Sequence, residues 1–231
     1  MAQSYLLSDL WVPLLLSLKV ASWATFFATI FGMGFAYLLS RSRSPLCHLV
    51  DSILTLPMVL PPTVIGYYLL VLFGRRGWLG QWLAEFGIEL VFTWQGAVIA
   101  ATVVAFPMVL KAARAAFEEV DHRLEDAGVV LGLHRAHVFF RISLPLALRG
   151  IMAGVLLAFA RALGEFGATL MIAGSIPGRT QTLSIAIYEA VQAGNEALAL
   201  MLVLVTSISC VVILWVAGVF TPAQHRHRGA R

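Results

Sequence analysis

Residues 123–145, RLEDAGVVLGLHRAHVFFRISLP, form a charged segment between two long apolar runs. The segment holds three arginines, two carboxylates and two histidines, although only 12% of the whole chain is charged. Each flanking run is long enough to cross a bilayer, for which about 20 apolar residues suffice. The segment is therefore expected to be a folded polar insert that connects two membrane spans.

The composition excludes an ordinary soluble domain. The 231 residues are 60% hydrophobic and their mean hydropathy is +0.87, whereas soluble domains carry about 25% charged residues. Too little polar surface would remain to cover a soluble core of this length. The formal charge is only +4 and no basic stripe with interleaved aromatic residues occurs, so nucleic-acid binding is not expected. The chain is predicted to be an all-α integral membrane protein.

Five apolar runs predict five transmembrane helices within a membrane domain that covers residues 8–220. The predicted spans lie at about 12–39, 50–73, 92–114, 147–172 and 197–220. A basic tail, 221–231, follows them. The second span contains Pro57, Pro61 and Pro62, and it is expected to kink or break because proline lacks a backbone donor and clashes with the preceding turn. The break is either a packing feature or the mark of a helix that lines a pathway.

The distribution of Lys and Arg predicts the orientation. One set of alternate segments carries two, six and three of these residues in 40–51, 111–149 and 222–231. The other set carries none, two and one in 1–11, 74–89 and 175–196. Cytoplasmic loops carry the excess of Lys and Arg. The N-terminus is therefore expected outside and the C-terminus in the cytoplasm, which makes the insert the largest cytoplasmic feature.

Within the insert, apolar residues recur at helical spacing and predict a short amphipathic helix over about 121–135. Asp121 is a suitable N-cap, and Gly132 marks the end of the helical pattern. The apolar stripe consists of Leu124, Ala127, Leu131 and, at a less regular spacing, Val130. Two interpretations remain open at this point: a solvated helix packed on lipid headgroups, or a helix that docks into a groove on a cytoplasmic partner.

The fourth apolar run contains the only opposite charges at membrane depth, Arg161 and Glu165, four residues apart and so on one helix face. They are expected either to lock the bundle as a structural ion pair or to lie near a transport pathway. The candidates for a pathway or gate are Pro61, Pro62, Thr63, Arg161, Glu165 and Thr169.

The sequence lacks the patterns that would make the chain an enzyme. It contains no G-x-x-x-x-G-K-[ST] phosphate loop, no H-E-x-x-H and no credible Ser/His/Asp set. Cys47 and Cys210 have no metal-binding spacing, and His134 with His137 are interpreted as solvated rather than as metal ligands. No catalytic residue, metal or cofactor is expected in this chain. A self-powered secondary transporter is a rival class, with Arg161 and Glu165 as its candidate ion sites.

The insert resembles the "EAA" loop of ABC importer permeases, whose pattern is E-A-A, three residues, G, nine residues, I-x-L-P. Asp126, Ala127 and Gly128 are followed by Gly132 and by I-S-L-P at the family spacing. Aspartate replaces the glutamate and glycine the second alanine. The resemblance implies a coupling helix that seats in a cleft of an ATPase subunit. The residues that it assigns to coupling are Glu125, Asp126, Ala127, Gly128, Gly132, Leu133, Ile142, Leu144 and Pro145.

Other segments resemble the molybdate permease subunits of ABC importers. The similar segments are 56–80, 106–127, 159–174 and 176–194, and the resemblance covers about 8–220. It implies the fold of type I ABC importer permeases, a homodimer in a bacterial inner membrane, two ATPase subunits that hold ATP and Mg, and a periplasmic molybdate-binding protein. Sulfate/thiosulfate permeases share a related plan and are the alternative, and tungstate matches molybdate in size and charge.

Overall fold

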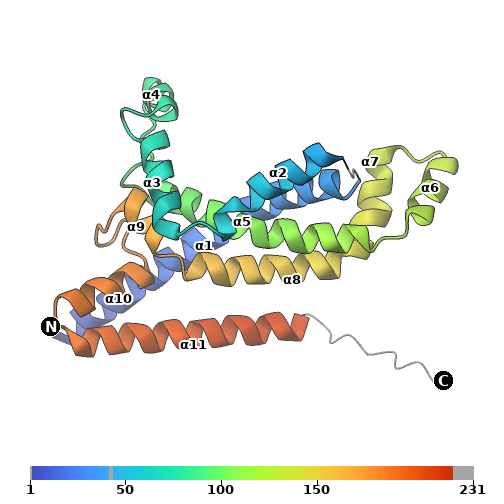
Figure 1. The fold of residues 1–231 in the computed structure, drawn as a ribbon. Coiled ribbons are helices and arrows are strands. Elements are labelled where there is room, and N and C mark those ends of the chain that lie inside the picture. The colour runs from blue at the N-terminus through green and yellow to red at the C-terminus, as the bar shows by residue number, and fades with distance from the viewer. Residues whose placement is uncertain (1, 42–43, 221–231) are drawn as a thin grey trace.

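The computed structural model describes residues 2–41 and 44–220, with the surroundings of side chains described for 10–41 and 44–215. The predicted basic tail, 221–231, lies outside these residues. Every element in the described part of the chain is helical (Figure 1). In chain order the elements are α1 (Ala2–Ser40), α2 (Pro45–Thr55), the 3-10 turn η1 (Leu56–Met58), α3 (Pro62–Phe73), α4 (Trp78–Glu85), α5 (Trp94–Glu118), α6 (His122–Val130), α7 (Arg135–Val138), the π-helical turn η2 (Phe139–Ser143), α8 (Leu144–Leu163), α9 (Gly167–Ala173), α10 (Leu183–Gln192) and α11 (Glu196–Phe220).

Helix α5 is the centre of the bundle and packs against α1 on one side and α8 on the other (Figure 1). Its buried face carries Val109, Leu110 and Phe117, which have no exposed surface. By contrast, α11 packs mainly on α10 and leaves most of its apolar surface uncovered. The described residues contain four single helices long and apolar enough to cross a membrane, or five when the bent pair of α2 and α3 counts as one span. The all-helical architecture and the number of spans agree with the prediction.

Small residues bring α5 and α8 close together. A Cβ atom built on Gly154 would lie 2.4 Å from the Cβ of Ala112, and one built on Gly150 would lie 2.6 Å from the Cβ of Ala116. The two glycines are four residues apart, as are the two alanines, so one face of each helix is flat enough for backbone approach. Close packing through small residues is common between membrane helices. Burying apolar surface there contributes little free energy, because the lipid tails are equally apolar.

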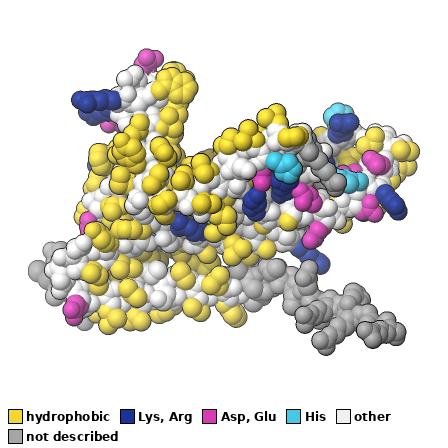
Figure 2. All heavy atoms as spheres, viewed as in Figure 1, with side chains coloured by type: hydrophobic (Ala, Val, Ile, Leu, Met, Phe, Trp, Pro, Cys, Tyr) yellow, Lys and Arg dark blue, Asp and Glu magenta, His cyan; other side chains and the backbone are white. Residues whose placement is uncertain are grey.

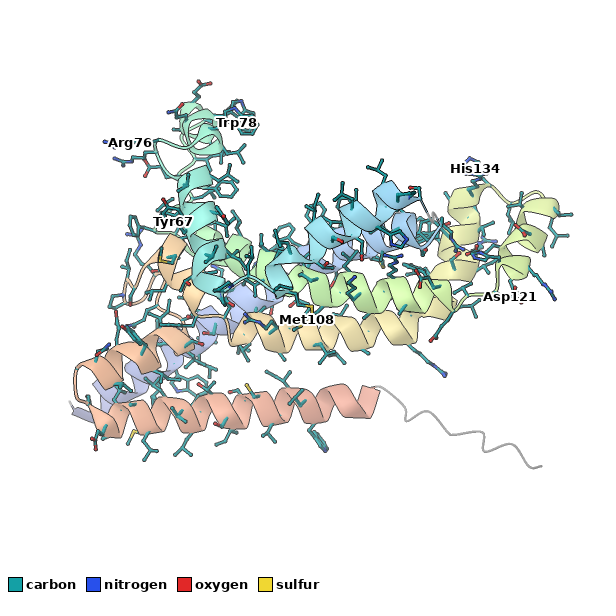
Figure 3. All side chains as sticks on the ribbon, viewed as in Figure 1. Tyr67, Arg76, Trp78, Met108, Asp121 and His134 are labelled. Atoms are coloured by element: carbon teal, nitrogen blue, oxygen red, sulfur yellow. The ribbon has the colours of Figure 1, made fainter. Side chains whose placement is uncertain are left out.

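The second span is broken, as its prolines predicted. The helix axis bends by 106° between the segments Pro45–Met58 and Pro62–Phe73. Helix α3 therefore crosses the direction of the main bundle, and α4 lies at its far end, where Arg76 and Trp78 are found (Figures 1 and 3). Helix α3 packs on α9 through Gly66, where an added Cβ would lie 2.8 Å from the Cα of Ala168.

The fourth span differs from the predicted helix at 147–172. It begins earlier, because Arg135–Leu163 is one continuous helical segment. The π-helical turn η2 lies directly before α8, and Pro145 is the second residue of α8, where the wide turn accommodates its missing donor. The span then breaks at 164–166, after which α9 continues.

Charged side chains gather at the two ends of the molecule, while apolar side chains cover most of the face between them (Figure 2). The larger charged group extends from α2 and the end of α5 to α6 and α7, and a smaller one lies around α4. This distribution matches a membrane-spanning body with two polar ends.

Candidate functional site

The insert forms a helical hairpin of α6 and α7 at one end of the bundle (Figure 1). Asp121 caps α6, since its side chain accepts a 2.9 Å hydrogen bond from the backbone N–H of Arg123. The helix ends at Val130, not near residue 135 as predicted. Asp121 and His134, at the starts of the two helices, are labelled in Figure 3.

Gly132 ends α6 in a conformation that other residues avoid. Its φ is +87°, in the left-handed region. The N–H of Gly132 donates to the carbonyl of Val129 over 2.9 Å, and the N–H of Leu133 donates to the carbonyl of Gly128 over 3.0 Å. These two bonds make the Schellman motif, in which glycine follows the C-cap. The predicted helix was too long because this turn reverses the chain before α7 begins.

Glu125 ties the insert to the rest of the molecule. Its Oε1 accepts hydrogen bonds from the guanidinium of Arg41, at the end of α1, and from the hydroxyl of Ser143, in η2. His122 Nδ1 lies 3.5 Å from the other carboxylate oxygen. The Glu125 side chain is only 12% exposed. One carboxylate therefore joins three elements, and charge-assisted bonds of this kind are stronger than neutral ones.

Neither Arg41 nor Ser143 was predicted to belong to the site. An arginine directly after the first span is expected in any cytoplasmic loop, and nothing in the sequence pairs it with a carboxylate 84 positions later. The structure also separates the two neighbouring carboxylates of the motif. Glu125 faces the bundle, whereas Asp126 is exposed.

Gly128 joins the two halves of the motif. It is buried, and a Cβ added to it would lie 2.8 Å from Ile142 Cδ1 and 3.2 Å from Val138 Cγ2. The helix α6 therefore packs closely on the segment that leads into α8. Among the predicted coupling residues, the buried or half-buried ones are Glu125, Gly128, Leu133, Ile142 and Leu144. The exposed ones are Asp126, Ala127, Gly132 and Pro145.

Helix α6 and its C-cap carry a group of exposed apolar side chains, called the apolar tip and defined here as Leu124, Val129, Val130 and Leu131. Val130 and Leu131 are 86% and 82% exposed. The tip lies outside the helices that are long and apolar enough to cross a membrane. A cluster of apolar side chains in such a place is typical of a surface that binds another protein.

The pathway candidates come together at the two broken spans. A Cβ built on Gly167, at the start of α9, would lie 3.1 Å from the Cβ of Pro62 and 3.3 Å from the backbone nitrogen of Thr63. The breaks in the second and fourth spans are therefore neighbours. Pro61, just before α3, is exposed, and Thr169, inside α9, is buried.

The predicted pair of Arg161 and Glu165 exists, and it lies at the second of these breaks. An Nη atom of Arg161 lies 2.7 Å from a carboxylate oxygen of Glu165, whose side chain is 1% exposed. The other carboxylate oxygen of Glu165 accepts a 2.9 Å hydrogen bond from the backbone N–H of Ala168. Glu165 thus holds both the arginine and the first turn of α9. Irregular backbone at membrane depth is stable only where protein buries it or where it lines water.

No group of three His, Cys, Asp or Glu side chains that could hold a metal ion occurs in the described part of the chain.

Residues 16–226 match the protein family described as "Binding-protein-dependent transport system inner membrane component". The chain belongs to this family. Members are the permease subunits of ABC importers, so the chain is a multi-pass membrane protein of a bacterial importer, and a separate ATPase and a binding protein are its partners. Permease subunits of this family lack ATPase activity and carry no cofactor, since the partner ATPase binds ATP.

Two of the family's curated members are similar over most of their length. The molybdenum transport system permease protein of Escherichia coli is 47% identical over 215 residues, which cover 90% of this chain and 94% of that protein. A putative molybdenum transport system permease protein of Bacillus subtilis is 44% identical and covers 83% of this chain and 85% of its own. The sulfate transport system permease protein of Escherichia coli is 37% identical over a region that covers 73% of this chain and 61% of that protein.

Solved structures of ABC transporters have the same fold. The permease of an inward-facing methionine ABC transporter superimposes with a TM-score of 0.73 over 92% of this chain and 94% of its own, at 17% identity. A bacterial ABC transporter involved in the import of alginate gives a TM-score of 0.70 over 94% and 80%, at 14% identity. The expected type I ABC importer permease fold is therefore confirmed.

Proposed function

We propose that this chain is the permease subunit of an ATP-driven molybdate importer in a bacterial inner membrane. The observation that carries the proposal is the 47% identity to a molybdenum permease over 90% of the chain. The identity to a sulfate permease is lower and covers less of both proteins. Molybdate is therefore favoured over sulfate and thiosulfate as the transported anion.

Competition during uptake tests this choice of anion. Radiolabelled molybdate uptake by cells that express this chain with its ATPase and binding protein should fall when unlabelled molybdate or tungstate is added. Sulfate at the same concentration should leave uptake almost unchanged, because an affinity difference of about 3 kcal/mol weakens its competition by roughly a hundredfold. Equal competition by sulfate would contradict the assignment and favour a sulfate permease.

We assign the docking of the ATPase to the exposed surface of α6. The apolar tip is exposed and would become buried in a groove of the ATPase, and the exposed Asp126 adds a charge beside it. A short amphipathic helix that seats in a groove is a recurring mode of recognition. Glu125 has a different role in this proposal: it holds α6 to α1 and η2, so that the docked helix moves together with the bundle.

Motion of the insert reaches the membrane through a rigid element. From Arg135 the chain is helical without interruption to Leu163. When ATP draws the two ATPase subunits together, each docked insert moves, and α8 moves with it as a lever. The rocking of helices about an interface is one of the known routes of alternating access.

The transport pathway in this proposal passes the junction of the two broken spans. Discontinuous helices form the substrate sites of many transporters, because their free backbone groups need water or protein partners. Arg161 is the cation at this junction, and its guanidinium is half-buried rather than fully enclosed. The interaction of the anion with this region must be weak, because tight binding would slow release.

We further propose a homodimer with the N-terminus outside and the C-terminus in the cytoplasm. The charge excess in the segments that include the insert supports the orientation. The exposed apolar face of α3, with Tyr67, Tyr68 and Val71, supports a second copy as the partner within the membrane. Tyr67 is labelled on α3 in Figure 3.

The substitution Gly132→Val should weaken ATPase binding about tenfold while the transmembrane bundle stays folded. A left-handed conformation strains a residue with a side chain by about 1–2 kcal/mol, and valine is β-branched. The strain would distort the end of α6 and the apolar tip beside it. Titration of the purified permease with its ATPase measures the loss.

Gly87→Val is the matched control, because Gly87 also has a positive φ, +71°, and open space around its Cα. It lies between α4 and α5, far along the chain from the insert. Its substitution should introduce similar strain and leave the ATPase affinity unchanged. Equal weakening by both variants would mean that general instability, and not the geometry of α6, lowers the affinity.

A further inference from the structure

A basic pocket of about 350 Å³ lies at the start of α5, the end of that helix that is farther from the insert. Lys19 of α1, Gln95 of α5, and Arg179 and Thr180 of the loop before α10 contribute to its lining. Lys19 and Arg179 are both exposed. Within residues 10–41 and 44–215 neither cation forms an ion pair with a carboxylate. Two uncompensated cations that line one pocket favour an anionic ligand.

The loop that carries Arg179 is well ordered by its own hydrogen bonds. Thr180 is fully buried, and its hydroxyl accepts from the N–H of Ile176 over 3.0 Å. The N–H of Arg179 donates to the carbonyl of Ile176 over 3.0 Å. On the other side of the pocket, Lys19 Nζ lies 3.6 Å from the centre of the Trp94 ring. Arg179 therefore extends from an ordered loop, and Lys19 is held by its contact with the Trp94 ring.

An apolar groove of about 470 Å³ lies beside this pocket, between α1 and α5. Trp94 and Gln95 line both spaces, so the two are neighbours. The groove is lined on the α1 side by Trp23, Phe27 and Phe31, and on the α5 side by Val98, Ile99 and Val103. One end of the combined site is cationic and the rest is apolar.

The length of the site matches one leaflet of a bilayer. Lys19, Trp23, Phe27 and Phe31 are spaced four apart and so follow one face of α1. From Lys19 to Phe31 a helix rises about 18 Å. Half of a hydrocarbon core about 30 Å thick is of similar length. A ligand with its charge at the pocket would thus extend along the groove to about the middle of the membrane.

We propose that this site binds one anionic phospholipid of the outer leaflet. Its phosphate lies between Lys19 and Arg179, and one acyl chain lies in the groove between α1 and α5. A free oxyanion would use the pocket and leave the groove without a role. A second copy of the chain would present apolar helix to the groove but no anion to the two cations.

Retention of lipid by the full chain tests the proposal. The purified protein is exchanged into detergent that contains phosphatidylglycerol or phosphatidylcholine, and bound lipid is counted by native mass spectrometry. Phosphatidylglycerol should be retained in preference to phosphatidylcholine. The double variant K19Q/R179Q should lower its retention by about tenfold or more, because each cation contributes about 1 kcal/mol to an anionic headgroup.

The double variant R75Q/R76Q is the matched control, since it removes two arginines from another loop predicted on the same side. It should leave retention unchanged. Ile99→Trp, which fills the groove and leaves the cations in place, should lower retention as well. Inorganic phosphate should not displace the lipid.

Three results would overturn the proposal. One is retention that is insensitive to K19Q/R179Q, and another is an equal loss in R75Q/R76Q. The third is binding that Ile99→Trp leaves intact and that phosphate displaces, because this pattern identifies a site for a free anion.

Discussion

Replacing Leu131 with glutamate is expected to abolish co-purification of the ATPase while leaving the permease folded. Leu131 is 82% exposed and belongs to the apolar tip, so the substitution removes little from the bundle. A carboxylate in the centre of a docked interface would lose its hydration and its contacts with the groove. Hot-spot residues of this kind contribute about 2–4 kcal/mol, which corresponds to at least about a thirtyfold loss of affinity. Pull-down of the ATPase and a titration in detergent measure the effect.

Leu131→Met is the matched control, because it keeps an apolar side chain of similar volume at the same position. It should retain the ATPase with less than about a threefold change in affinity. If Leu131→Glu binds the ATPase as tightly as the unchanged chain, the apolar tip is not the docking surface. The interpretation of α6 as a solvated helix on the headgroups would then be favoured.

Replacing Glu165 with alanine is expected to destabilise the bundle and stop transport. The substitution leaves Arg161 without its 2.7 Å partner and removes the acceptor for the N–H of Ala168. Removal of one member of a buried ion pair destabilises by about 3–5 kcal/mol, because the remaining charge is uncompensated. Thermal unfolding in detergent measures the stability, and molybdate uptake measures the function.

The double variant R161M/E165Q separates a structural pair from a pathway pair. Both charges are gone, and glutamine still offers an oxygen to Ala168, so most of the lost stability should return. If Arg161 lies on the pathway of the anion, uptake by the double variant should stay below about a tenth of the normal rate. An increase of about 1.4 kcal/mol in the activation free energy of transport already lowers the rate tenfold. Full uptake by a stable double variant would show that the pair only locks the helices.

The sequence was a good guide to features that arise from local composition. Apolar runs predicted long apolar helices, which the structure contains, and the three prolines predicted the break that the 106° bend displays. Asp121 was predicted to cap α6, and it does so. Each of these features depends on side chains within a few positions, so no knowledge of the tertiary structure was needed.

Features that depend on distant residues were not predicted. The bonds from Arg41 and Ser143 to Glu125 join parts of the chain that the fold brings together. The break after Leu163 was also missed. At Gly164, the first residue of this break, an added Cβ would have only its own helix within reach, with the carbonyl of Ala160 at 3.7 Å. The glycines that do allow close approach, such as Gly66 and Gly154, have no distinguishing sequence signal, because their partners lie on other helices.

Reconstitution into liposomes tests the central claim most directly. The permease, its ATPase and its binding protein are incorporated together, and accumulation of radiolabelled molybdate is followed with and without ATP. We expect accumulation only when all three components and ATP are present, and none with the permease alone under an ion or proton gradient. Accumulation by the permease alone would identify a self-powered transporter and contradict the account.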